Sequence, residues 1–156
     1  MAEFTLHKSM PKIISINISE KKGISKSPVK EVFFKENWGL QGDAHAGPGD
    51  RQVSLLDVEA INTFNQSLPI DIKRVKPGDF AENLTVDGMN LVSVKPGTHL
   101  KIGNVLLEIS MIGKKCLKPC AIYKKIGSCI MPTKGVFARV IKGGEIRRGD
   151  EIQKEK

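Results

Sequence analysis

Short apolar segments separated by turn-forming residues occupy most of the second half of this chain of 156 residues. β-Branched and apolar runs favour strands, whereas Gly, Pro and Asn between them favour tight turns. Strands are predicted at residues 90–94, 99–102, 105–111, 136–141 and 145–152. Their close spacing is typical of antiparallel meanders.

The first half of the chain adds two predicted strands and one predicted helix. Residues 14–19 alternate isoleucine with serine or asparagine, a pattern of period two that indicates a half-buried strand. Residues 53–56 form another apolar run. Asp57 then suits the N-cap of a helix of about three turns, with Glu59 in its first turn. The apolar face of that helix would contain Ile61, Phe64 and Leu68.

Together these elements predict a mainly β, barrel-like domain of antiparallel strands with a few short helices. A chain of this length with 40% apolar residues fits a single domain with an ordinary core. The domain is expected to span residues 1–156, with its core at about 12–153 and flexible tails. No apolar segment suits a signal peptide or a membrane span, so a cytoplasmic location is expected.

The excess positive charge of the chain is local. Residues 109–144 contain eight Lys or Arg residues and no Asp or Glu, whereas the whole chain has 25 basic and 17 acidic residues. Without these eight, 17 basic residues face 17 acidic ones, so the net charge of +8 belongs to this segment. All three cysteines, Cys116, Cys120 and Cys129, lie in it. A positive field attracts anions and favours a thiolate over a thiol.

Cys120 is the strongest candidate for a nucleophile. Residues 118–127 predict a short helix, because Pro119 suits the first helical position and Gly127 suits the position just past the end. Cys120 would lie in the first turn, where backbone N–H groups and the helix dipole stabilise a thiolate. Lys118 and its neighbouring lysines would add to this effect. The alternative, a buried cysteine that acts as a small apolar residue, stays open.

Other roles of the cysteines are also open. Cys129 is interpreted as structural, and Cys116 as an accidental or supporting thiol. The three cysteines with His45 or His99 would supply enough ligands for zinc, but C-x3-C-x8-C is not a usual closed-site spacing and the positive charges oppose a cation. A Cys/His hydrolase would use Cys120 as the nucleophile and one of these histidines as the base.

A glycine-rich loop at residues 38–52 is the first candidate binding loop. Closely spaced glycines let backbone N–H groups approach an anion. Asp43, His45 and Arg51 are its candidate binding residues, and the last two suit a phosphate or a polar heterocycle. The alternative is a surface crossover whose glycines only serve turns.

The second candidate loop covers residues 77–84. Glu82 and Asn83 offer hydrogen-bond acceptors and an amide donor, which suit the edge of a nitrogen heterocycle. The alternative is that both side chains tie the loop to the protein's own backbone.

Six segments in order resemble the MOSC family, which is named for the C-terminal domain of molybdenum-cofactor sulfurases. The similarity runs from about Lys12 to Gln153, almost the whole chain, and it is the combination of segments that is specific rather than any one of them. The matching segments are residues 39–45 (GLQGDAH), 51–56 (RQVSLL), 77–84 (PGDFAENL), 97–103 with 107–109, 118–120 (KPC), and 135–139 (GVFAR) followed by 149–150.

The resemblance implies a β-barrel-like domain in which Cys120 either carries sulfur as a persulfide or ligates the molybdenum of a bound pterin cofactor. Both roles require a thiolate, in agreement with the predicted place of Cys120 at a helix start. The anionic phosphate of this cofactor would suit the basic segment. The residues expected to bind the cofactor are Asp43, His45, Arg51, Glu82, Asn83, Lys118 and Arg139.

The predicted function therefore lies in molybdenum-cofactor metabolism, either cofactor binding or sulfur transfer to the cofactor. Two alternatives are a molybdenum-dependent reductase of N-hydroxylated compounds with a separate redox partner, and a non-catalytic cofactor-binding module. The chain has no room for a pyridoxal-phosphate-dependent desulfurase domain, and no pyridoxal phosphate of its own is expected. A separate cysteine desulfurase, or an enzyme that makes or uses the cofactor, is the expected partner. Neither a membrane nor nucleic acid is expected, since the basic segment has few aromatic residues for base stacking.

Overall fold

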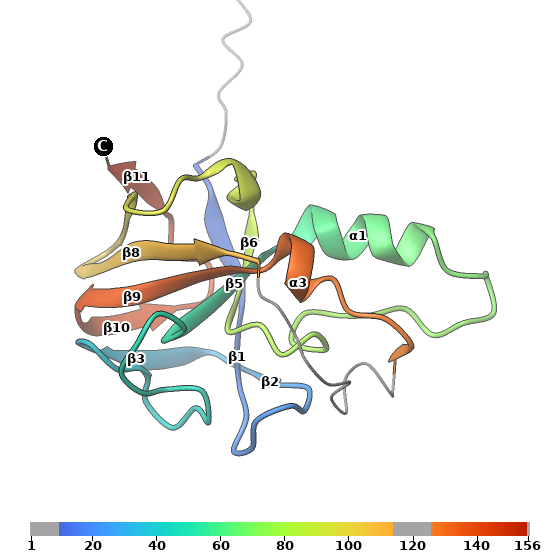
Figure 1. Cartoon of the computed structure of the whole chain (residues 1–156), viewed down its shortest axis with the longest axis horizontal. Coiled ribbons are helices and arrows are strands. Elements are labelled where there is room, and N and C mark those ends of the chain that lie inside the picture. The colour runs from blue at the N-terminus through green and yellow to red at the C-terminus, as the bar shows by residue number, and fades with distance from the viewer. Residues whose placement is uncertain (1–9, 114–125, 156) are drawn as a thin grey trace, which may run out of the picture.

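The computed structural model describes residues 10–113 and 126–155, which form an eight-stranded sheet, a three-stranded sheet and short helices (Figure 1). The predicted mainly β fold is confirmed. The helices are α1 (Val58–Gln66), α3 (Met131–Lys134) and the 3-10 helix η1 (Leu91–Ser93). The strands are β1 (Lys12–Ile18), β2 (Ser27–Val29), β3 (Glu31–Lys35), β4 (Gly39–Leu40), β5 (Val53–Asp57), β6 (Leu84–Asp87), β7 (His99–Ile102), β8 (Val105–Ile112), β9 (Val136–Lys142), β10 (Gly144–Arg147) and β11 (Gln153–Glu155).

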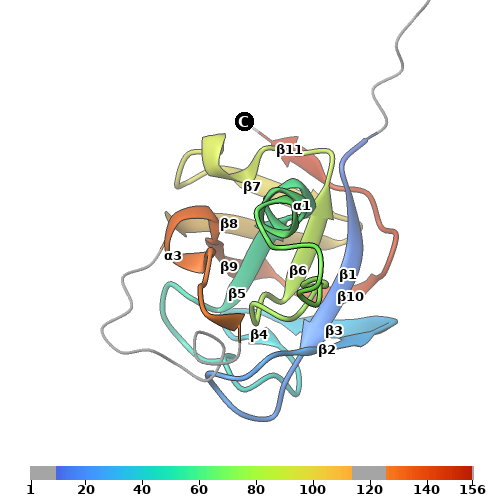
Figure 2. The same ribbon diagram turned by 90° about the vertical axis from the view of Figure 1, so that its right-hand side faces the viewer.

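The larger sheet is curled, with the strand order β11-β7-β8-β9-β5-β6-β1-β2 (Figure 2). Its two ends approach each other, because the start of β1 is bonded to the segment that leads into β11. The Ile13 N–H donates to the Asp150 carbonyl at 2.9 Å, and the Ile152 N–H donates to the Pro11 carbonyl at 2.7 Å. These backbone bonds bring the open sheet close to a barrel.

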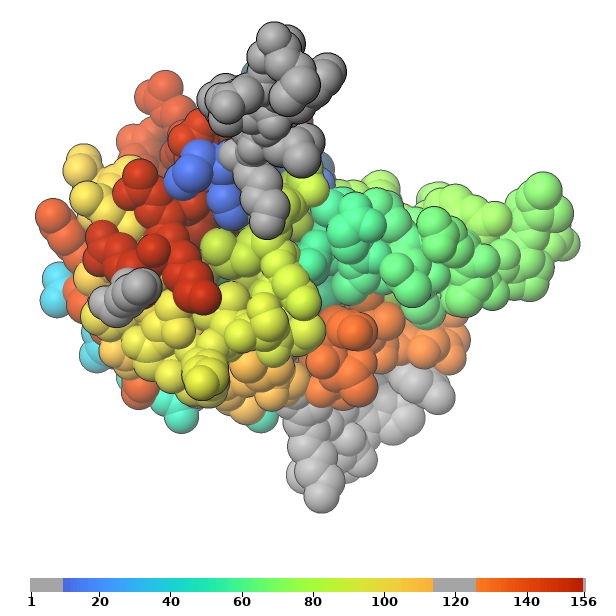
Figure 3. Space-filling model, turned by 90° about the horizontal axis from the view of Figure 1, so that it is seen from above, coloured from blue at the N-terminus to red at the C-terminus, as the bar shows by residue number. Residues whose placement is uncertain are grey.

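One neighbouring pair in this sheet, β5 and β6, runs in parallel. Parallel strands need a crossover connection, and α1 lies in the chain between these two strands. Figure 3 shows that α1 and the loop after it extend away from the sheets. Among the described residues, no helix has the length and apolar character needed to cross a membrane.

A single apolar cluster is shared by both sheets. Phe34 and Leu40 of the smaller sheet are fully buried, as are Ile16, Leu55 and Leu107 of the larger one, and all five belong to one cluster. The removal of this apolar surface from water is the main force that holds the two sheets together.

Helix α1 begins where the sequence predicts. The Asp57 carboxylate accepts a hydrogen bond from the Glu59 N–H at 2.9 Å, as an N-cap residue does. Ile61 is buried, and the Phe64 ring meets the Phe80 ring edge-on with 5.2 Å between centroids. The helix ends at Gln66, so the prediction that Leu68 belongs to its apolar face is wrong.

Two predicted elements differ from the structure near the C-terminal half. Residues 90–94 form the turn of η1 instead of a strand, and Ser93 Oγ donates to the Asn90 carbonyl at 2.7 Å, a local bond that competes with strand pairing. The strand predicted at 145–152 ends at Arg147, where the Asp150 carboxylate accepts from the Arg147 N–H at 2.9 Å and closes a turn. Lys154 and Glu155, which the sequence places in a flexible tail, pair with β7 together with Gln153.

The alternating pattern of β1 predicts a half-buried strand, but most side chains of this strand are buried on both faces. A register shift between Ile13 and Ser15 places Ile13 fully in the core, whereas Ile14 is only partly buried. Ser15 and Asn17 are buried as well. Since buried polar side chains need hydrogen-bond partners, this strand must contribute to a polar interior.

The register shift leads to a stability prediction. We expect Ile13→Ala to lower the free energy of unfolding by about 2–5 kcal/mol, the usual cost of such a truncation in a core. The matched control, Ile14→Ala, should cost clearly less because that side chain is partly exposed. Urea unfolding of both variants tests this, and a larger cost for Ile14→Ala would contradict the observed register.

Candidate functional site

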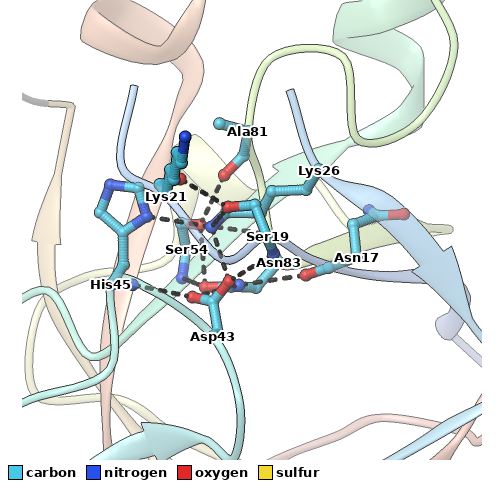
Figure 4. A network of polar contacts seen from close by, with 9 residues as sticks. All are labelled: Asn17, Ser19, Lys21, Lys26, Asp43, His45, Ser54, Ala81 and Asn83. Carbon is cyan, nitrogen blue, oxygen red and sulfur yellow. Dashed lines mark hydrogen bonds and ion pairs between the residues drawn. The ribbon is translucent and has the colours of Figure 1, made fainter. Parts of the chain in front are cut away.

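A buried network of polar side chains joins β1, β5 and three loops (Figure 4). The curl of the sheet brings these segments together from distant parts of the sequence. The members are Asn17 and Ser19 at the end of β1, Lys26 before β2, Asp43 and His45 in the glycine-rich loop, Ser54 in β5, and Asn83 just before β6.

A buried ion pair lies at the centre of this network. Lys26 Nζ is 2.7 Å from Asp43 Oδ1, and both side chains are 0% exposed. Lys26 Nζ also donates to Ser19 Oγ at 3.1 Å, while that hydroxyl donates its own proton to the Lys21 carbonyl at 2.9 Å. Buried charges persist only when they are paired and hydrogen bonded, and this pair meets both conditions.

The Asp43 carboxylate accepts three further hydrogen bonds. They come from the Ser19 N–H at 3.0 Å, the His45 N–H at 3.2 Å and Asn83 Nδ2 at 3.1 Å. Burial acts to raise the pKa of Asp43, but the hydrogen bond and charge of Lys26, with the bonds from Ser19 and Asn83, outweigh it and lower the pKa. The carboxylate is therefore ionised at neutral pH and fixes the glycine-rich loop against the end of β1.

Asn83 connects the ion pair to the sheet. Its Nδ2 also donates to the Asn17 carbonyl at 3.2 Å, and its Oδ1 accepts from the Ser54 N–H at 3.0 Å and from Ser54 Oγ at 3.1 Å. The residue is 0% exposed. The Asn83 side chain thus binds its own loop to neighbouring segments, as in the second of the two roles predicted for it. Contact of Asn83 with a heterocycle stays a prediction.

Glu82 forms a second arm of the network, which is connected to the first through Thr85 and Asn17. Its Oε2 accepts from Thr85 Oγ1 at 2.8 Å, and that hydroxyl accepts from Asn17 Nδ2 at 3.3 Å. Its Oε1 is buried without a hydrogen-bond partner among the described residues. Burial raises the pKa of Glu82 to about 7, although the backbone N–H groups of Gly78 and Glu82 act in the opposite direction. A predicted ligand contact for Glu82 likewise stays untested.

His45 is the half-buried member of the network. Its Nδ1 lies 3.0 Å from Lys26 Nζ, and its backbone N–H is bonded to Asp43. Figure 4 shows the ring turned so that Nδ1 faces Lys26 while the other ring nitrogen faces away from Asp43. The imidazole is thus held from one side by the buried ion pair.

Gly78 allows the two loops to approach each other. Its φ of +91° suits glycine, and a Cβ atom there would lie 2.4 Å from the Lys26 carbonyl oxygen. The Lys26 N–H donates to the Gly78 carbonyl at 2.8 Å, so the close approach holds the backbone of Lys26 in place.

Arg139 and His99 belong to a separate surface cluster on β7, β8 and β9. Arg139 pairs with Glu108 Oε1 at 3.0 Å and with Asp50 Oδ1 at 2.9 Å, and His99 Nε2 lies 3.1 Å from Glu108 Oε2. The His99 hydrogen bond lowers the pKa of Glu108, burial opposes this, and the bond and charge of Arg139 lower it further. Ser110 Oγ donates to the Asp50 carbonyl, which ties the glycine-rich loop to β8.

The remaining predicted residues lie elsewhere or outside the described residues. Arg51 is exposed, with its guanidinium 5.8 Å from the centroid of the Phe137 ring. Cys129 is partly buried and packs against the apolar cluster under α1. Cys116, Lys118 and Cys120, with most of the predicted helix at 118–127, lie outside the described residues, so their predicted roles stand on the sequence alone.

Lys26 lies at the centre of the network but was not among the residues predicted for the site. A lysine in a polar turn is normally solvated, and the segment around it, Ser25-Lys26-Ser27-Pro28, carries no burial signal. The sequence feature that could have indicated a buried polar partner is the row of Ser15, Asn17 and Ser19 in and just after β1. Polar side chains of a strand that become buried require hydrogen-bond partners from other segments.

The family model of the MOSC domain matches residues 41–153 of this chain. The match begins within the glycine-rich loop and includes Asp43, His45 and Asn83 of the polar network. The chain belongs to the MOSC domain family. Because this family is associated with the molybdenum cofactor, membership implies a function related to that cofactor.

Similar proteins agree with this membership at the level of sequence and fold. The chain is 26% identical over 144 residues to the uncharacterized protein YflK of Bacillus subtilis, a match of 84% of this chain and 62% of YflK. The chain thus spans about three fifths of the length of that relative.

Solved structures with the same fold include the YuaD protein of Bacillus subtilis and YiiM from two bacteria. YuaD superposes with a TM-score of 0.74 at 19% identity, covering 92% of this chain and 94% of YuaD. YiiM from Geobacillus stearothermophilus superposes with a TM-score of 0.73 at 22% identity, covering 94% of this chain and 75% of YiiM. YiiM from Escherichia coli superposes with a TM-score of 0.71 at 20% identity, covering 95% of this chain and 71% of YiiM.

The buried ion pair gives a prediction for a double-mutant cycle. Lys26→Met leaves a buried carboxylate without its cation and should lower the free energy of unfolding by about 3–5 kcal/mol. Adding Asp43→Asn to this variant removes the stranded charge and should recover part of the loss. Denaturant unfolding measures both effects. A Lys26→Met protein within about 0.5 kcal/mol of wild type would contradict the central place of the pair.

The raised pKa of Glu82 predicts a pH dependence of stability. The folded protein binds a proton at Glu82 more tightly than the unfolded chain, so this contribution is present below the ordinary pKa of 4.5 and is lost as the pH rises to about 7. The unfolding free energy of wild type minus that of Glu82→Gln should fall by on the order of 3 kcal/mol across this window. Thermal or urea unfolding from pH 4 to pH 8 measures it, and a difference that rises with pH would refute the assignment.

Proposed function

We propose that this protein acts in molybdenum-cofactor metabolism, binding the molybdopterin cofactor and carrying sulfur as a persulfide on Cys120. The family match supports the cofactor. The observation that supports this site is the buried ion pair that fixes residues 39–45, one of the segments that resemble the family, because a loop held firmly offers a preorganised surface.

The described residues fit an anionic cofactor. His45 is half-buried at the edge of the network, and Arg51 exposes a guanidinium on the same loop. The net charge of +8, concentrated in residues 109–144, suits a phosphate-bearing ligand. Lys118 and Arg139 are proposed to contribute to this field. When bound, the cofactor supplies a redox-active molybdenum centre.

Sulfur would reach the protein from a separate pyridoxal-phosphate-dependent cysteine desulfurase. The Cys120 thiolate attacks the outer sulfur of the persulfide on the desulfurase, the S–S bond of the donor breaks, and the donor cysteine leaves as a thiolate. The step transfers one sulfur atom without an external oxidant or reductant. A molybdenum-ligand role for Cys120 uses the same thiolate, and the two roles give different experimental outcomes.

Purification from a host that makes the cofactor separates these roles. We expect molybdenum and pterin to copurify with the wild-type protein, and incubation with a cysteine desulfurase and cysteine to add the mass of one sulfur to Cys120. Cys120→Ala should abolish the sulfur adduct. If that variant also loses its molybdenum, Cys120 serves as a metal ligand.

Cys129→Ala is the matched control, because Cys129 packs against an apolar cluster and should be dispensable for both readouts. A wild-type protein that acquires neither cofactor nor sulfur would refute the proposed function. Reduction of an N-hydroxylated compound by the cofactor-loaded protein with an added redox partner would instead support a reductase.

A further inference from the structure

We infer that Lys26 fixes His45 as a neutral imidazole with its proton on Nε2, so that His45 acts as a hydrogen-bond donor to an anionic acceptor and not as a general base. This inference deepens the proposed function, on which its ligand depends. It starts from the contact of 3.0 Å between Lys26 Nζ and His45 Nδ1.

The protonation state of Lys26 follows from its partners. The Asp43 carboxylate, 2.7 Å away, has a lowered pKa and is ionised, which favours the ammonium form of Lys26. The Ser19 hydroxyl already donates to the Lys21 carbonyl at 2.9 Å, so its oxygen accepts from Lys26. Both contacts therefore define Lys26 as a donor.

An ammonium group has no lone pair and can only donate. His45 Nδ1 must then be the acceptor in its contact with Lys26, and the ring proton must lie on Nε2. A second proton on the ring would place a positive charge 3.0 Å from the ammonium, which Coulomb repulsion disfavours. Lys26 thus acts as a positioning residue that selects one tautomer of His45.

The chemistry of the ligand follows from this tautomer. An Nε2–H donor on a half-buried ring suits an acceptor atom with negative charge, such as an oxyanion or anionic sulfur of the bound cofactor. A base that removes a proton from a thiol needs a ring nitrogen with a lone pair directed at that proton, and the lone pair of His45 is directed at Lys26. The Cys/His hydrolase alternative is thereby disfavoured for His45.

The tautomer is measurable without any cofactor. We expect ¹⁵N NMR of imidazole-labelled protein at pH 7.5 to show Nδ1 of His45 with an unprotonated, pyridine-like shift and Nε2 with a protonated, pyrrole-like shift. Lys26→Met should abolish this fixed pattern, while the His99 resonances, which depend on Glu108, should not change. A protonated Nδ1 in the wild-type protein would overturn the inference.

Cofactor retention tests the donor role. His45→Gln carries an amide N–H to about the position of Nε2 and should retain the cofactor. His45→Leu has no such donor, so its affinity for the cofactor should fall roughly 10-fold or more, which corresponds to the loss of one charge-assisted hydrogen bond. Thermal melts of both variants control for folding. Wild-type retention by His45→Leu, or equal loss by both, would refute the donor role.

The two proposals fail separately. If wild-type protein binds no cofactor, the proposed function and the ligand of His45 are refuted together, while the NMR result still decides the tautomer. If cofactor binds but Nδ1 carries the proton, the proposed function stands and the role assigned to Lys26 is refuted.

Discussion

The buried pair between Lys26 and Asp43 is the interaction on which the arrangement of the site depends. Its three additional partners, Ser19, His45 and Asn83, come from separate segments, so the pair fixes several loops at once. Replacing such a pair with apolar residues often leaves a protein equally stable, because desolvation offsets attraction. The pair is therefore better explained by the geometry it imposes than by stability.

Much of the fold follows from local sequence signals. β-Branched runs separated by glycine turns predicted β7, β8 and β9, and Asp57 with Glu59 predicted the start of α1. These signals are local, since propensity and capping act within a few residues. The failures have non-local causes. A register shift against β6 placed Ile13 in the core and left Ile14 only partly buried, so that residues on both faces of β1 are buried. Pairing with β7 ordered Lys154 and Glu155.

The candidate site was predictable only in part. The glycine-rich loop and the Glu82–Asn83 loop were identified, and the structure brings Asp43, His45 and Asn83 together. Arg51 and Arg139 make their contacts elsewhere, with Phe137 and with Glu108 and Asp50. Lys26 escaped detection because its burial depends on a carboxylate 17 residues away and on the close approach permitted by Gly78. Contacts between segments that are distant in the sequence produce no regular spacing of residue types from which they could be predicted.

The edges of the curled sheet have a consequence for solubility. One edge is β2, in which Pro28 cannot donate a backbone hydrogen bond, and the other is β11, whose side chains at 153–155 are all exposed and include Lys154 and Glu155. Neither edge invites an additional strand from a neighbouring molecule. The short strand β11 thereby shields β7, whose alternating apolar side chains would otherwise border an unpaired backbone open to aggregation.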